Sequence, residues 1–134
     1  MKSLFLLCGA FAIWCVMLAA AQETTLEGAY AVKGMWEKPY TGHADVTEAN
    51  GVVNLAWFND AGQQLGIGVG LREGAILSVI FQSGNSIGLA AYRITGTTLI
   101  GRWLYPGELG LFTETLTKGT HKPHPTAGLQ AAAP

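Results

Sequence analysis

The stretch that decides the fold is Val46-Thr47-Glu48-Ala49-Asn50-Gly51-Val52-Val53-Asn54-Leu55. Its centre is Asn50-Gly51, a dipeptide that tolerates the positive backbone angles of a tight β-hairpin. Apolar residues stand at every second position after the turn, at Val53, Leu55 and Trp57. Alternation of this kind is typical of a strand with one buried face, so the stretch predicts two antiparallel strands joined by a two-residue turn.

Turn signals of the same kind recur along the chain at intervals of roughly ten residues, the spacing of an all-strand domain. They are Asn59-Asp60-Ala61-Gly62, Arg72-Glu73-Gly74, Ser83-Gly84-Asn85, Gly96-Thr97 and Pro106-Gly107. Eight strands are predicted between them, at 26–33, 40–48, 52–58, 64–71, 75–81, 86–95, 98–104 and 110–117. Short connections favour an antiparallel meander, and eight strands lose their open edges by closing into a small barrel. A flattened sandwich is the alternative.

Alternation also assigns an inner face to each predicted strand. Gly66, Gly68 and Gly70 fall on this face at a period of two, where they leave room for large rings of neighbouring strands. Because no helix follows them, they are not expected to cradle a phosphate. The inner face is predicted to carry Leu26, Tyr30, Val32, Tyr40, Val46, Val53, Leu55, Trp57, Leu77, Val79, Phe81, Tyr92, Ile94, Leu99, Trp103, Phe112 and Leu116.

The predicted outer face is polar on the first two strands and apolar from the third strand onward. Broad apolar patches are rare on monomers in water, so this face predicts self-association through strands four to seven. An error of register is the simpler explanation. A transmembrane barrel also has an apolar exterior, but it needs strands of about 9–11 residues, long loops on one side and a polar lumen. The strands predicted here are mostly shorter, their loops are short at both ends, and the inner face is aromatic, so the transmembrane barrel is the less favoured alternative.

Residues 1–21 have the three parts of an export signal: Lys2, an apolar centre over 4–18, and the small residues Ala19 and Ala21 before Gln22. Cleavage before Gln22 is therefore expected, with an uncleaved anchor as the alternative because about 20 apolar residues cross a bilayer. The chain then divides into a signal peptide (1–21), a β-barrel domain (22–118) and a flexible C-terminal tail (119–134), and the protein is expected to be periplasmic or secreted.

Charge and cysteine content narrow the function classes. Seven Lys or Arg and nine Asp or Glu follow residue 21, so there is no basic stripe for nucleic acid. Both cysteines, Cys8 and Cys15, lie in the predicted signal peptide. The domain must therefore be stable without a disulfide, which a chain of this length can achieve by packing.

Four residues are predicted to bind a ligand or partner: Trp36, Tyr40, Tyr92 and Glu114. Glu114 lies two residues from both Phe112 and Leu116, so its side chain is predicted to point to the same inner face. A buried carboxylate must be paired, hydrogen-bonded or protonated. Either it bonds an interior tyrosine or a backbone amide and closes the last strand, or it fixes the polar group of a ligand in the barrel mouth. Trp36 lies in the connection between the first two strands, where it is a recognition residue or a lid.

Other candidate chemistry is weaker. His121 and His124 lack a third metal ligand nearby, and His43 and Asp45 have no nucleophile placed beside them by the sequence. We therefore predict no catalytic residue, no metal site and no cofactor.

Several motifs carry a resemblance that covers most of residues 26–117. They are Gly28-x-Tyr30-x-Val32-x-Gly34, Tyr40-Thr41-Gly42, Trp57 before Gly66-x-Gly68, Leu99-x-Gly101-x-Trp103 and Thr113-Glu114-x-Leu116. In these the chain resembles a family of small secreted bacterial β-barrel proteins, some of them labelled fibronectin-binding. The family usually has an Asn-Pro-Asp-Gly-like turn after the first strand, where this chain has Met35-Trp36-Glu37-Lys38-Pro39. The resemblance implies a fold and offers no catalytic residues.

These observations favour an exported, non-enzymatic binding or interaction protein, whose partner is a small apolar ligand or an extracellular protein. Two alternatives stay open: a hydrolase or isomerase that uses an inward carboxylate at the barrel mouth, and a structural envelope protein.

Overall fold

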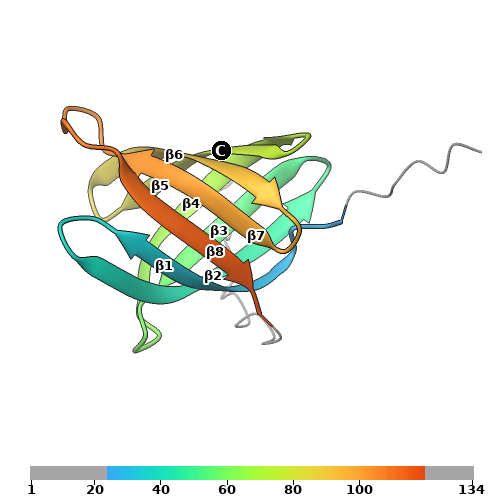
Figure 1. Cartoon of the computed structure of the whole chain (residues 1–134), viewed down its shortest axis with the longest axis horizontal. Coiled ribbons are helices and arrows are strands. Elements are labelled where there is room, and N and C mark those ends of the chain that lie inside the picture. The colour runs from blue at the N-terminus through green and yellow to red at the C-terminus, as the bar shows by residue number, and fades with distance from the viewer. Residues whose placement is uncertain (1–23, 120–134) are drawn as a thin grey trace, which may run out of the picture.

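Eight antiparallel strands build the fold of the described part of the chain (Figure 1). The computed structural model describes residues 24–119. The strands are β1 (Gly28–Met35), β2 (Pro39–Ala49), β3 (Val52–Phe58), β4 (Gln64–Glu73), β5 (Ile76–Ser83), β6 (Ser86–Thr95), β7 (Thr98–Leu104) and β8 (Phe112–Lys118). The predicted all-β fold is confirmed. No helix occurs among these residues, and hence none long and apolar enough to cross a bilayer.

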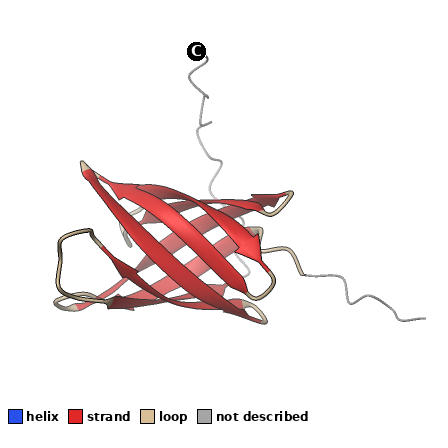
Figure 2. Cartoon of the chain, turned by 90° about the horizontal axis from the view of Figure 1, so that it is seen from above, coloured by secondary structure: helices blue, strands red, loops and turns tan. Residues whose placement is uncertain are grey.

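The sheet is a closed barrel in which every strand pairs with its neighbours in sequence (Figure 2). β1 and β8 complete the ring, with Val32 opposite Leu116 and Gly34 opposite Glu114. Closure decides between the barrel and the sandwich in favour of the barrel, because no strand is left with an unpaired edge.

Strand ends differ from the predicted ones by a few residues. β1 runs to Met35, which pairs with Pro39, so that the connection shrinks to residues 36–38. β4 and β5 extend to Glu73 and Ser83, whereas β8 begins only at Phe112. In β1, β4 and β5 the hydrogen-bonded pairing between strands extends into residues predicted as turns, and turn composition alone does not reveal this extension. The predicted signal peptide (1–21) and nearly all of the predicted tail lie outside the described residues.

Tight turns close four of the hairpins. Asn50 and Gly51 have φ angles of 54° and 76°, as a two-residue turn with both central residues in the left-handed region requires. Gly84 has φ of 58° at the first turn position between β5 and β6, where other residues would be strained.

One end of the barrel is sealed by packing. Leu26 and Tyr30 are 3% and 2% exposed, and the hydroxyl of Tyr30 donates to the carbonyl oxygen of Leu26 at 2.7 Å. Beside them, Glu48 forms a salt bridge with Arg72 (3.1 Å) and accepts from the N–H of Leu26 (2.6 Å). Burial opposes the charge of Glu48, but these hydrogen bonds outweigh it and hold the pKa of its carboxyl below its usual range.

The predicted inner face is confirmed by burial. The core residues that are less than 9% exposed include Leu26, Tyr30, Val32, Val46, Val53, Leu55, Leu77, Val79, Tyr92, Leu99, Trp103 and Leu116. Tyr40, Trp57, Phe81, Ile94 and Phe112 are partly buried and pack against that core.

Large rings lie over glycines of the neighbouring strand. A Cβ atom on Gly68 would meet the Trp57 ring at 2.9 Å, and one on Gly88 or Gly101 would clash with Phe81 or Tyr92. The expectation that inward glycines make room for rings is therefore confirmed for Gly68, and Gly88 and Gly101 serve the same purpose. At Gly66 and Gly70 it is not met, because the atoms nearest to an added Cβ are the backbone oxygens of Gln82 and Ser78.

The apolar outer face is present as well. Exposed aliphatic side chains on β4–β7 and the loop before β8 include Val69, Leu71, Ile76, Ile80, Ile87, Leu89, Ile100 and Leu111. We call these eight residues the outer patch. Three of them lie side by side on adjacent strands, because Val69 pairs with Ile80 and Ile80 pairs with Leu89.

Candidate functional site

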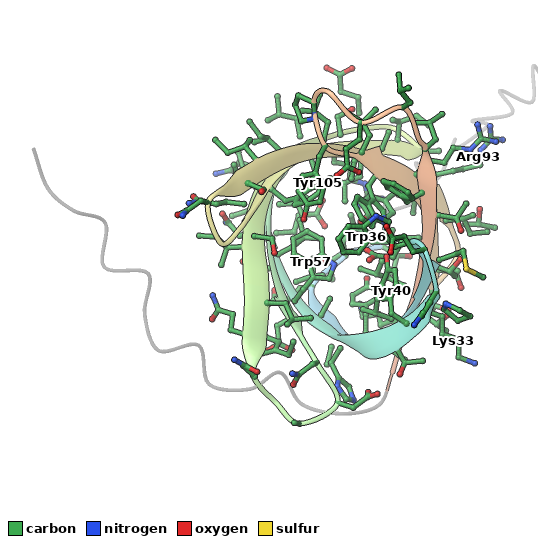
Figure 3. The ribbon with its side chains drawn as sticks, turned by 90° about the vertical axis from the view of Figure 1, so that its left-hand side faces the viewer. Lys33, Trp36, Tyr40, Trp57, Arg93 and Tyr105 are labelled. Atoms are coloured by element: carbon green, nitrogen blue, oxygen red, sulfur yellow. The ribbon has the colours of Figure 1, made fainter. Side chains whose placement is uncertain are left out.

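The end opposite Leu26 is open and forms the mouth of the barrel (Figure 3). Connections 36–38, 59–63 and 105–111 lie there, and they are longer than the two-residue turns of the sealed end. A cavity of about 580 Å³ extends from this mouth into the barrel. Binding pockets of proteins typically occupy about 300–1,000 Å³, so the cavity has the size of a ligand site.

Glu114 is the polar centre of the cavity. Its side chain projects inward from the start of β8 and the residue is only 7% exposed. The hydroxyl of Tyr92 donates to Oε1 at 2.7 Å, and the indole Nε1 of Trp57 donates to the same oxygen at 3.1 Å. The hydroxyl of Tyr40 donates to Oε2 at 2.8 Å, so three strands of the barrel converge on one carboxylate.

A second layer holds Tyr40 in place. The indole Nε1 of Trp103 donates to the Tyr40 hydroxyl oxygen at 2.9 Å, which leaves the hydroxyl hydrogen directed at Glu114. No buried polar side-chain atom of the described chain lacks a hydrogen-bond partner. Every buried polar atom of the network therefore has at least one partner, as a polar cluster inside a barrel needs to avoid a large desolvation penalty.

Burial sets the electrostatics of the site. Desolvation raises the pKa of Glu114, and the hydrogen bonds from Tyr92, Tyr40 and Trp57 counteract it only in part. The pKa values of Tyr40 and Tyr92 are also raised, first by desolvation and then by the nearby Glu114 charge. Both hydroxyls consequently stay protonated and remain hydrogen-bond donors at any physiological pH.

Aromatic rings form one wall and the rim of the mouth. Trp36 packs edge-on against Trp103, Tyr105 and Phe112, with ring centroids 5.9, 6.3 and 6.0 Å apart. In Figure 3 the ring of Trp36 lies over the opening, with Tyr40 and Trp57 around it and Tyr105 at the rim. Because Trp36 is still 47% exposed, it covers the rim without sealing it.

The structure brings all four predicted binding residues to one place, since Trp36, Tyr40, Tyr92 and Glu114 all line the cavity. Glu114 does bond interior tyrosines, as one of its two interpretations required, and it also faces the cavity, as the other required. Trp36 lies at the barrel end, a position that suits both of its predicted roles, recognition residue and lid.

Sequence reasoning missed part of the site. Trp57 and Trp103 were expected only as core residues, but their indole N–H groups belong to the hydrogen-bond network. Tyr105 was not singled out at all, although it lies two residues after the inward-facing Trp103 and so falls on the same face. This two-residue spacing, directly before the Pro106-Gly107 turn, is the signal that could have identified Tyr105.

The weaker candidates do not form a site. His43 is exposed on the outer face of β2, whereas Asp45 is buried at 8% exposure, so the predicted solvated face does not extend to Asp45. Within residues 24–119, no three His, Cys, Asp or Glu side chains are grouped so as to hold a metal ion. His121 and His124 lie outside the described residues.

Fold and site together define a closed antiparallel β-barrel with an aromatic mouth and one buried carboxylate. The chain matches no protein-family model, and no curated protein is detectably similar to it in sequence. The resemblance to small secreted bacterial barrel proteins therefore stays a prediction.

Proposed function

We propose that the protein binds a small, mostly apolar ligand in the mouth of its barrel and catalyses no reaction on it. The observation that carries this proposal is the aromatic cavity of about 580 Å³ with a single polar centre at Glu114. Ligand sites in proteins usually combine such apolar walls with a few convergent polar groups. The predicted signal in residues 1–21 supports binding in the periplasm or outside the cell.

A hydrolase or isomerase is the alternative that uses the same residues. The raised pKa of Glu114 suits a general acid, which favours that alternative. Against it, the three groups that bond the Glu114 carboxylate are two phenols and an indole. The raised pKa values of Tyr40 and Tyr92 keep both phenols protonated and poor as bases or nucleophiles, so the arrangement favours holding a ligand over transforming it.

The proposal is tested by titrating the protein with N-phenyl-1-naphthylamine, an uncharged fluorophore that brightens in apolar surroundings. We expect saturable binding that also changes the emission of the cavity tryptophans. Ser83 lines the cavity, so Ser83→Trp should fill the mouth and weaken binding at least tenfold. Gln82→Trp is the matched control, because Gln82 is the exposed neighbour of Ser83 on β5 and does not line the cavity.

Equal binding by both variants would place the fluorophore elsewhere and remove the proposal. The natural ligand is then sought by mass spectrometry of small molecules that the protein retains when it is purified from its native compartment.

A second proposal concerns the outer patch, through which we infer that two copies of the barrel associate. The observation that favours it is the exposure of eight aliphatic side chains, each between 44% and 61%, on one side of the molecule. Monomers rarely expose apolar patches beyond a few hundred Å². This association is independent of the mouth, and its test is given in the Discussion.

A further inference from the structure

The hydrogen bonds around Glu114 use up the donors of the cavity network. The hydroxyl hydrogens of Tyr40 and Tyr92 and the indole hydrogen of Trp57 all point at the carboxylate. The indole hydrogen of Trp103 is directed at the Tyr40 oxygen. Phenol and indole groups each have a single hydrogen to donate, so none of these four side chains has one left for a ligand.

Acceptor capacity, in contrast, is left over. An ionised carboxylate offers about four lone-pair sites, and three of them are occupied here. The free site belongs to Oε2, which accepts only from Tyr40. The hydroxyl of Tyr92 donates to Glu114, and its oxygen accepts from no described residue. A ligand that reaches this centre therefore finds acceptors and must itself supply the hydrogen.

Charge at the centre of the cavity points the same way, while the mouth around it carries one charge of each sign, at Glu37 and Lys38. No basic side chain of residues 24–119 forms a salt bridge with Glu114, and the influences on its pKa are burial and neutral hydrogen-bond donors. An ionised carboxylate at 7% exposure without a counter-charge is costly. A ligand cation would remove that cost, whereas a ligand anion would add to it.

The walls suit a cation with an apolar body. Trp36, Trp103 and Tyr105 form one aromatic cluster at the mouth, with Trp103 and Tyr105 ring centroids 5.5 Å apart. Faces of Trp and Tyr rings attract ammonium groups, and their apolar surface also packs against hydrocarbon. A cation on its way to Glu114 therefore keeps favourable contacts with these rings while it passes the rim.

We propose that the ligand of this cavity is an apolar primary amine, bound as its ammonium ion with an N–H donated to Glu114 and its hydrocarbon body against the aromatic wall. This inference depends on the binding function proposed above and names the chemical class of its ligand.

The test compares three probes that share a phenyl body and differ in the head group: 2-phenylethylammonium, 2-phenylethanol and phenylacetate. Binding is measured at pH 7.5 by calorimetry and by tryptophan fluorescence. Charge-assisted hydrogen bonds contribute about 1.5–3 kcal/mol, so we expect the ammonium probe to bind about 10- to 100-fold more tightly than the alcohol. Phenylacetate should bind more weakly than either.

Glu114→Gln provides the matched variant, because it retains the size of the side chain and removes its charge. The preference for ammonium over alcohol should fall to less than about threefold, while N-phenyl-1-naphthylamine still binds. Should this variant fail to fold, the order of the three probes on the unaltered protein decides the question alone.

The outcomes separate this inference from the function it depends on. If the naphthyl fluorophore binds but the alcohol or phenylacetate equals or exceeds the ammonium probe, the amine is excluded and the binding function stands. If the three probes fail to bind while the fluorophore binds, the amine is excluded in the same way. If neither the probes nor the fluorophore binds, both proposals fail.

Discussion

Glu114 combines two opposing influences in one side chain. Burial favours its neutral form, whereas three donated hydrogen bonds favour the carboxylate. The net result is a raised pKa, so the folded protein holds the Glu114 proton more tightly than the unfolded chain does. Such a group links protonation to stability as well as to ligand binding.

The first prediction concerns the pH dependence of unfolding. Glu114 titrates near 4.5 in the unfolded chain and higher in the folded protein. Between these two values the folded state binds more protons, so the Glu114 contribution lowers the free energy of unfolding as pH rises. Urea unfolding from pH 4.5 to 8 should show this decline in the unaltered protein and a flatter profile in Glu114→Gln.

The other groups whose pKa is shifted titrate outside that window. The lowered pKa of Glu48 makes its contribution present above about 4.5 and lost only as pH falls further. Tyr40 and Tyr92 have pKa values above their usual 10, so they act only in strong alkali. Parallel profiles for the two proteins between pH 4.5 and 8 would contradict the raised pKa of Glu114.

At the scale of the strands, the mouth depends on pairs of one ring and one glycine. Tyr92 on β6 lies directly opposite Gly101 on β7, and Tyr40 on β2 lies opposite Gly34 on β1. Each tyrosine ring occupies the space that a side chain on its partner would fill. The glycines thus allow both hydroxyls to reach the carboxylate of Glu114.

The second prediction is that Gly101→Ala destabilises the barrel and disturbs the site. The new methyl group would overlap the Tyr92 ring and lie 2.7 Å from the carbonyl oxygen of Ala91, which is backbone and moves little. Overpacking of this kind costs about 1–3 kcal/mol, measurable by urea unfolding. As a control, Ala91→Ser on the exposed outer face of β6, the strand of Tyr92, should change stability by less than about 0.5 kcal/mol.

If Gly101→Ala leaves both stability and ligand binding unaltered, the ring–glycine pair does not position Tyr92.

Strand number, order and inner face followed from the sequence because a two-residue period and turn chemistry are local signals. Asn50-Gly51 marks one such turn. From Val53 to Trp57 every second side chain faces the core, so the face of each residue follows from its position in the alternation. The ends of β1 and β8 did not follow from local signals. Met35 joins the ladder opposite Pro39 and Thr113, and β8 pairs with β7 only from Phe112 onward, opposite Trp103.

The site was predicted as a set of residues but not as a network. Tyr40 and Glu114 are 74 positions apart and meet only because β1 and β8 close the ring. Parity could place Trp57 and Trp103 inside the barrel, but it could not show where their indole nitrogens point. The position of Trp36 over the mouth depends on the path of a short loop, for which the sequence has no periodic signal.

On the scale of the whole molecule, the two proposed functions use different surfaces. The mouth faces one end of the barrel axis, whereas the outer patch lies on the side formed by β4–β7. Ligand entry at the end therefore leaves the side free for a second barrel. Val69, Ile80 and Leu89 form a continuous apolar row at the centre of that side.

The third prediction is that the chain from Gln22 onward forms a dimer through this side, and that Ile80→Glu disrupts it. Ile80 is 49% exposed, so a carboxylate is tolerated in the monomer but is desolvated and unpaired in an interface between two apolar faces. Light scattering after size exclusion should give twice the monomer mass for the unaltered chain and the monomer mass for Ile80→Glu. Thr47→Glu, exposed on the polar side of β2, should remain dimeric. A monomer at every concentration of the unaltered chain would leave the exposed row without a partner copy and refute the association.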